Sequence, residues 1–139
     1  MATVIRAEIS ERNRYWIDKH RHYELKHFCL QYPIWKKEYA SYSNIGPNLS
    51  KFEELYSSGM KSDPTANWAV KRTYYKERMK LIEDVAKATD EYLHIYILKA
   101  VTEDLSYTYL QTKMNIPCSR NTYYDRYRRF FWLLNKSRK

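Results

Sequence analysis

The sequence predicts an all-α protein in which N-terminal helices are joined by a long helix to a C-terminal helix-turn-helix. Only two glycines and four prolines occur among 139 residues, so the tight hairpin turns of a many-stranded β-fold are scarce. Apolar residues recur every three to four positions over long stretches, which is the spacing of a helix with one buried face. The length suits one domain, or a small domain carried on a helical arm.

Two helical segments are expected in the region from about residue 8 to residue 42. Ser10 together with Asn13 can open a helix that runs to about Gln31. Pro33 then interrupts or kinks the element because proline lacks an amide donor, and a second segment follows it. The stretch SYSNIGPNLS (41–50) is the expected loop, and a short helix is plausible over residues 48–56.

A long connecting helix is expected over residues 64–88. Asp63 can cap its free amides, and Pro64 fits the first helical position. Thr89 or Asp90 should cap the next helix, whose apolar residues point nearly all round and indicate a buried helix; these are Tyr92, Leu93, Ile95, Tyr96, Ile97, Leu98 and Val101.

A short helix over residues 104–114 and a final basic helix complete the expected order. Asp104 should start the short helix, with Leu105, Tyr109, Leu110 and Met114 turned inward. The stretch NIPCS (115–119) then breaks the chain, and Ser119 can cap a helix that reaches Leu134 or beyond. One face of that helix should pack on the core and consists of Tyr123, Tyr127, Phe130, Phe131 and Leu134. The opposite face carries Asn121, Tyr124, Asp125 and Arg128.

Positive charge is concentrated at the C-terminal end of the chain. The net charge is +9, and residues 118–139 hold seven Arg or Lys against one Asp. Such a segment favours a polyanion such as nucleic acid, or an anionic membrane surface. The apolar face of the final helix is needed as core, and no stretch approaches the roughly 18 apolar residues of a membrane span. No membrane partner is therefore expected. A solvated basic face without a ligand remains an alternative.

The order of a buried helix, a short helix, a turn and a basic helix indicates double-stranded DNA as the partner. A recognition helix places its N-terminal residues on base edges in the major groove, where Arg can bind guanine and Asn can bind adenine. The expected DNA-binding residues come from the cap, the displayed face and its flanks, and are Ser119, Arg120, Asn121, Thr122, Tyr124, Arg126, Arg128 and Arg129.

The chain also resembles the RinA-type family of phage and prophage transcriptional regulators, which are relatives of the promoter-reading domain of sigma factors. The resemblance rests on SDPTANWAVKR (62–72), LIEDVAKATDEYLHIYILKAVTED and IPCSRNTYYDRYRRFFWLL, with a weaker echo in residues 22–41. It implies regulation of phage late genes, with DNA-reading positions at Ser119, Arg120, Asn121, Thr122, Tyr124 and Arg128. The turn NIPCS is about two residues longer than the family's usual one.

No metal, cofactor or catalytic activity is expected. His20, His22, His27 and Cys29 lack the spacing of three or four that ligands on one helix require. The carboxylates fall in adjacent pairs that diverge on a helix, and no glycine-rich phosphate loop is available with only Gly46 and Gly59. The N-terminal stretch lacks the apolar run of a secretory signal, so a cytoplasmic protein with reduced cysteines is expected. The resemblance to phage regulators implies that this is the cytoplasm of a bacterial host cell.

The sequence therefore predicts an N-terminal helical interaction region (1–61) and a DNA-binding domain with the long helix and the helix-turn-helix (62–139). The expected function is sequence-specific DNA binding in transcription control. A second copy of the chain or RNA polymerase is a further expected partner, because residues 15–42 carry more aromatic rings than one helix pair can bury. The alternative is a non-enzymatic protein-interaction module whose basic C-terminus gives only nonspecific nucleic-acid binding.

Overall fold

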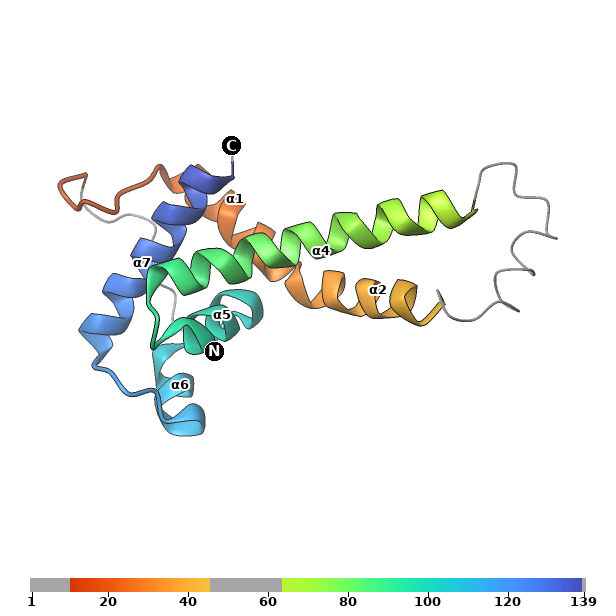
Figure 1. The fold of residues 1–139 in the computed structure, drawn as a ribbon. Coiled ribbons are helices and arrows are strands. Elements are labelled where there is room, and N and C mark those ends of the chain that lie inside the picture. Colours follow the sequence, from red (N-terminus) through yellow and green to blue (C-terminus); the bar gives the residue numbers. More distant parts are fainter. Residues whose placement is uncertain (1–10, 46–63, 139) are drawn as a thin grey trace. The chain divides into compact units, whose positions relative to one another are not determined.

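The computed structural model describes residues 11–45 and 64–138, and these residues fold into helices without any strand (Figure 1). The helices are α1 (Lys19–Leu30), α2 (Tyr32–Ile45), α4 (Pro64–Thr89), α5 (His94–Glu103), α6 (Tyr107–Met114) and α7 (Arg120–Ser137). The predicted all-α class is confirmed. The short helix expected over residues 48–56 lies outside the described residues.

The chain forms two compact units, and their division differs from the predicted boundary after residue 61. Unit 1 combines Met1–Gln31 with Leu81–Lys139, and unit 2 is Tyr32–Lys80. Helix α4 therefore contributes its first part to unit 2 and its last turns to unit 1. Helix α1 belongs to unit 1 because its buried side chains, Leu25, Phe28 and Cys29, complete the core that α5 and α7 begin.

The core of unit 1 is built around one face of α7. Its five apolar residues, Tyr123, Tyr127, Phe130, Phe131 and Leu134, are all buried, as predicted. Phe131 lies edge-on to Tyr127 and Phe130, with ring centroids 4.9 and 5.1 Å apart. Helix α1 adds the His22 ring at 4.8 Å from Phe131. Edge-to-face packing of this kind adds stability beyond the burial of the ring areas themselves.

The N-terminal helix begins at Lys19, so the predicted start at Ser10 is wrong. Residues 11–18 form turns and extended backbone. The Asn13 side chain accepts the Tyr15 amide at 2.8 Å, and its carbonyl accepts the Trp16 amide at 3.0 Å. Tyr15 and Ile17 are then buried in unit 1. A local asparagine turn and tertiary burial together override the helical pattern of this stretch.

Polar contacts fix α1 against the C-terminal end of α7. Arg21 donates to the Asn135 side chain at 2.7 Å and also to the Arg138 carbonyl. Arg138 in turn donates to Glu24 at 2.8 Å, and its guanidinium lies over the Phe28 ring at 4.2 Å. Helix α1 and the C-terminal end of α7 are thus joined through polar side chains that are partly exposed.

In unit 2, α2 and the first part of α4 pack through aromatic rings. The Tyr42 and Tyr75 rings are stacked at 6.1 Å, and the Arg72 guanidinium lies 5.4 Å from the Tyr39 ring. Pro33 sits in the first turn of α2, as its predicted role as an interruption requires. Helix α2 extends to Ile45, so the predicted loop at 41–50 is wrong for its first half; residues 46–50 lie outside the described part.

Helices α4 to α6 follow the predicted order, but two assignments of their side chains are wrong. Helix α4 begins at Pro64 as expected, while Asp63 is outside the described residues. Helix α5 is not buried all round, because Ile95 is 61% exposed, and Tyr92 in the turn just before the helix is 82% exposed. Its buried side chains lie on one face and are Ile97, Ala100, Val101 and Thr102.

Helix α6 starts after Ser106, not at Asp104. Asp104 adopts a left-handed conformation with φ 55° and ends α5, while the Leu105 amide donates to the Ala100 carbonyl at 3.1 Å. This is a common way to satisfy the last carbonyls of a helix. The start at Ser106 rotates the helix so that Tyr107 is buried and Tyr109 is 41% exposed, whereas Tyr109 was expected to point inward.

The buried face of α7 predicts a large stability difference between two aromatic substitutions. Phe131→Ala should lower the free energy of unfolding by about 3 to 5 kcal/mol, because it leaves a cavity in the core. Tyr92→Ala, at an 82% exposed position, should change it by less than about 0.5 kcal/mol. Urea unfolding followed by circular dichroism measures both values. Similar losses in the two variants would contradict the assignment of this face to the core.

His22 predicts a loss of stability under mildly acidic conditions. Burial, and secondarily the nearby Lys26 charge, lower the pKa of His22 from 6.5 to about 4. Between pH 6.5 and about 4, His22 therefore binds a proton in the unfolded chain but stays neutral in the folded protein. Stability should be fully present above pH 6.5 and fall by up to ~3 kcal/mol as the pH drops to about 4.

Thermal unfolding between pH 7 and pH 4 measures this loss. His22→Phe keeps a ring in the same site and should flatten the pH dependence, while His27→Phe at an exposed position of α1 should retain it. If the stability of the His22→Phe protein fell with pH as steeply as that of the wild type, the pH dependence would belong to other titratable groups.

Candidate nucleic-acid interface

The candidate site begins with the short helix α6 and the turn that follows it. The Ser106 side chain accepts the Tyr109 amide at 3.1 Å and caps the start of α6. Asn115 ends the helix in a left-handed conformation with φ 53°. The Ile116 amide then donates to the Leu110 carbonyl at 3.1 Å, and the Ile116 side chain is buried. Both ends of the helix are therefore fixed by defined hydrogen bonds.

Tyr107 connects the start of α6 to the start of α7. Its hydroxyl donates to the Cys118 carbonyl at 2.6 Å, and its ring lies 5.7 Å from the Tyr123 ring. The Arg120 guanidinium lies over the Tyr107 ring at 5.2 Å. One tyrosine of α6 thus contacts the turn, the buried face of α7 and the first residue of α7. This arrangement holds the five-residue connection 115–119 in place.

Ser119 caps α7 as predicted. Its side chain accepts the Thr122 amide at 3.2 Å, and its hydroxyl donates to the Thr122 hydroxyl oxygen at 3.0 Å. The next three side chains, Arg120, Asn121 and Thr122, are all exposed. The first turn of α7 therefore presents a cation, an amide and a hydroxyl to solvent, while the next residue, Tyr123, is fully buried.

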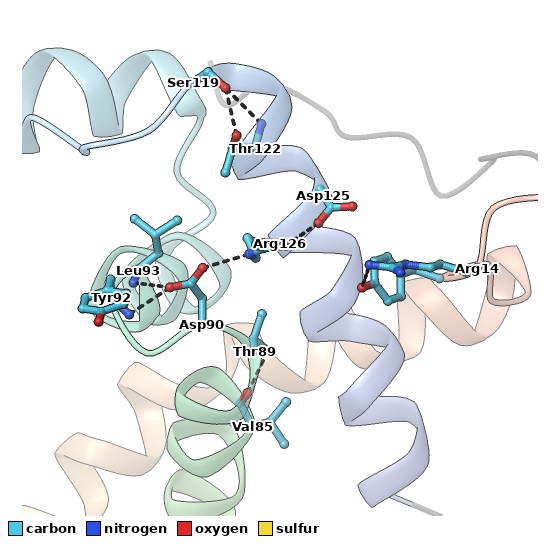
Figure 2. A network of polar contacts seen from close by, with 11 residues as sticks. Arg14, Val85, Thr89, Asp90, Tyr92, Leu93, Ser119, Thr122, Asp125 and Arg126 are labelled. Atoms are coloured by element: carbon cyan, nitrogen blue, oxygen red, sulfur yellow. Dashed lines mark hydrogen bonds and ion pairs between the residues drawn. The ribbon is translucent and has the colours of Figure 1, made fainter.

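Arg126 is held by carboxylates within the molecule (Figure 2). Its Nε donates to Asp90 Oδ2 at 2.8 Å, and a terminal nitrogen donates to Asp125 Oδ2 at 2.6 Å. The other oxygen of Asp90 accepts the Tyr92 and Leu93 amides at 2.8 and 2.9 Å. Asp90 therefore fixes the turn that leads into α5 and ties that turn to the middle of α7. The predicted cap of the helix by Thr89 or Asp90 is wrong, because α5 begins only after Leu93, which makes no side-chain cap hydrogen bond.

Both members of this ion pair have shifted pKa values. Burial alone would raise the pKa of Asp90, but the hydrogen bond from Arg126 and the two amide hydrogen bonds lower it below its ordinary value. The hydrogen bond to Asp90 raises the pKa of Arg126. Both groups therefore stay charged at neutral pH. Arg126, which the sequence predicted as a DNA contact, instead joins α7 to the turn before α5 through its ion pair with Asp90.

The remaining predicted site residues lie further along α7 and are partly covered. Tyr124, through its hydroxyl, accepts a hydrogen bond from Arg120 at 3.2 Å. Arg128 is half-buried, and its Nε is enclosed without a hydrogen-bond partner among the described residues. Arg129 is half-buried beside Trp132. The structure therefore brings Ser119, Arg120, Asn121, Thr122 and Tyr124 together at one end of α7, with Arg128 and Arg129 one to two turns away.

Comparison of the chain with protein-family models, curated proteins and solved structures gave no match. The resemblance to the RinA-type family therefore stays a prediction, and the proposals below rest on the geometry of the residues themselves.

Other candidate chemistry was sought in the described part of the chain. Within residues 11–45 and 64–138, no group of three or more His, Cys, Asp or Glu side chains is placed to hold a metal ion. Both cysteines are free, and burial raises the pKa of the Cys29 and Cys118 thiols. In this same part of the chain, none of the helices is both long and apolar enough to cross a membrane.

Several residues beside α7 were not selected from the sequence. Arg14, Tyr15 and Trp132 line an open pocket together with Arg129. The stretch RNRYW (12–16) shows the same mixture of rings and cations as α7, and this was the available signal. The pairing of two segments so far apart in the sequence depends on the tertiary fold, which composition cannot reveal.

The Asp90–Arg126 pair predicts different effects for two charge-removing substitutions. Asp90→Asn keeps an oxygen for the Tyr92 and Leu93 amides but removes the charge that Arg126 needs, so it should lower the free energy of unfolding by about 1.5 to 3 kcal/mol. Asp125→Asn, at a more exposed carboxylate, should cost less than about 1 kcal/mol. Urea unfolding at pH 7 compares them. Equal small effects would show that this ion pair does not position α7.

Proposed function

We propose that this chain is a sequence-specific transcriptional regulator of phage or prophage genes in the bacterial cytoplasm, and that α7 reads double-stranded DNA in the major groove. The observation that carries the proposal is the division of α7. Five apolar side chains bury one face, while Arg120, Asn121 and Thr122 in the first turn are exposed. A recognition helix requires this arrangement, because its rear must pack while its N-terminal residues reach base edges.

The elements before α7 support the same proposal. Helix α6 is eight residues long, a five-residue connection follows, and α7 has eighteen residues. In a helix-turn-helix the first helix supports the second across a short turn. Tyr107 offers such support through its contacts with Cys118 and Tyr123. The connection is slightly longer than the usual three or four residues.

The exposed first turn has the chemistry of base readout. An asparagine amide can donate to and accept from adenine, and an arginine fork can donate twice to guanine. Asn121 and Arg120 would take these roles, with Thr122 and Tyr124 near a thymine methyl or a phosphate. Arg128 and Arg129 add positive charge for phosphates further along the helix. Arg126 would position α7, since its guanidinium is held by Asp90 and Asp125.

A specific observation favours the second candidate, a protein-interaction module. In unit 2, α4 exposes Val70 (68%) and Tyr74 (47%) beside a groove lined with Ala69, Thr73 and Glu77. Exposed apolar side chains that cluster on one face often mark interaction sites. In the aromatic-rich stretch 15–42, by contrast, Tyr15, Phe28 and Trp35 are buried, and Tyr23 is the one exposed ring among its Phe, Trp and Tyr residues. A dimer or an RNA polymerase contact stays a prediction.

Selection of bound sequences from a random duplex pool tests the proposed function. We expect one enriched motif, because base contacts made by a fixed recognition helix discriminate among sequences. Recovery of unenriched DNA, with strongly salt-dependent binding to every duplex, would favour the interaction module with a nonspecific basic end.

Asn121 provides the sharpest single-residue prediction for this function. Asn121→Ala should weaken binding to the selected site by about 1 to 3 kcal/mol and leave random-duplex binding nearly unchanged. Fluorescence anisotropy with the two labelled duplexes measures both affinities. Asn67→Ala removes an amide from an exposed position of α4 and should leave both affinities as in the wild type. An equal loss of Asn121→Ala on both duplexes would contradict a role in base readout.

A further inference from the structure

The segment before α1 lies along α7 and forms a pocket with it. Arg14 and Tyr15 from this segment, with Arg129 and Trp132 from α7, line an open pocket of about 280 Å³. The Tyr15 ring is buried and packs edge-on against Trp132 with centroids 5.5 Å apart. Figure 2 shows Arg14 beside α7, on the opposite side of the helix from Asp90. The pocket therefore belongs wholly to unit 1.

Cationic groups gather around this pocket without carboxylate partners. The Arg14 guanidinium lies over the Tyr15 ring at 4.6 Å and donates to the Tyr15 hydroxyl at 2.6 Å. The Lys136 ammonium lies 3.4 Å from the centre of the Trp132 ring. Among residues 11–45 and 64–138, no ion pair involves Arg14, Arg129 or Lys136. Arg14 and Lys136 are held on aromatic rings, and Arg129 lines the pocket beside Trp132. Like charges in one place repel one another, and an anion placed between them would relieve that repulsion.

The aromatic contacts also make the pocket a fixed site. Tyr15, which is itself buried, contacts Arg14 in two ways. Its ring lies under the Arg14 guanidinium, and its hydroxyl accepts a hydrogen bond from a terminal nitrogen of Arg14. A guanidinium that is already oriented loses less side-chain entropy when it binds phosphate oxygens. The pocket is open to solvent and has a volume of about 280 Å³. It can therefore accept a phosphodiester group together with part of its hydration.

The position along α7 matches the dimensions of DNA. Arg129 follows Asn121 by eight residues, which at 1.5 Å per residue is about 12 Å along the helix. The major groove of B-form DNA is also about 12 Å wide. A helix that enters the groove with its first turn at base edges carries its later turns out toward the sugar-phosphate backbone, and this pocket lies on those later turns.

We propose that the pocket formed by Arg14, Tyr15, Arg129 and Trp132 binds a backbone phosphate of the DNA duplex. The inference rests on the proposed function, since it assumes that α7 lies in the groove. It assigns to the segment before α1 a contact that adds affinity and fixes the register of the protein without reading sequence. Residues 11–17 are not helical, and this non-helical segment places Arg14 beside α7.

The test is the salt dependence of binding by the full chain carrying Arg14→Ala, Arg14→Lys or Lys76→Ala. Loss of one phosphate contact should make the slope of log affinity against log salt shallower by about 0.9 and weaken binding about fivefold at roughly 0.15 M salt. Arg14→Ala should show both effects equally on the selected site and on a random duplex. Arg14→Lys should keep the wild-type slope. Lys76→Ala, which removes an exposed charge of α4 in unit 2, should keep both the slope and the affinity.

The outcomes separate this inference from the proposed function. A wild-type protein that binds DNA with a slope that Arg14→Ala leaves unchanged overturns the phosphate pocket and leaves the recognition helix intact. The same result follows if Arg14→Ala and Lys76→Ala shift the slope equally, because only total charge would then matter. Absence of any duplex binding by the wild type rejects the proposed function as well. Binding to anionic lipid vesicles that Arg14→Ala weakens, with duplex binding unchanged, would assign the pocket to a membrane surface.

Discussion

Burial of the aromatic face of α7 is the constraint on which the rest of unit 1 depends. Each of its large side chains contributes about 1.5 to 3 kcal/mol by leaving water, and together they fix the rotation of the helix about its axis. Once Tyr123 and Tyr127 point inward, Asn121 and Thr122 must point outward. Burial raises the pKa of the Tyr123 and Tyr127 hydroxyls, so both stay neutral. The Tyr123 hydroxyl costs stability because it is buried without a partner among the described residues. The rings therefore act mainly as apolar bodies.

Six arginines of unit 1 fall into two groups by their main polar partners. Arg126, Arg21 and Arg138 lie beside carboxylates or carbonyls of other segments and hold α7 against the Asp90 turn and α1. Arg14, Arg120 and Arg129 lie beside aromatic rings instead, as does the Lys136 ammonium. A ring supports a cation without neutralising it, so this second group keeps its charge available to an anion. The high aromatic content of the chain thus serves charge display as well as core packing.

Local signals were enough to predict most helices. Pro64 and Ser119 mark real helix starts, and the spacing of apolar residues in α7 identified all five of its buried side chains. Errors arose where another segment decided the outcome. Ser10 and Asn13 resemble a helix start, yet Asn13 makes a turn, while Ile17 is buried in unit 1 and Tyr15 is buried against Trp132 of α7. Asp104 has a side chain suited to a helix start, but it forms the left-handed end of α5, and Ser106 caps α6 instead.

In the candidate site, too, the part formed by one helix could be predicted from the sequence, and the part formed by two distant segments could not. Its readout end could be predicted because α7 is one continuous helix, whose periodicity fixes which residues share a face. The pocket at Arg129 could not, because half of it comes from a segment at the other end of the chain. If α7 lies in the groove, a single helix would combine a first turn that discriminates sequences with a later turn that only meets a phosphate. The covering of Trp132 by Tyr15 is then the feature that makes the second contact rigid, so that affinity and register depend on the N-terminal segment while specificity depends on the first turn of α7.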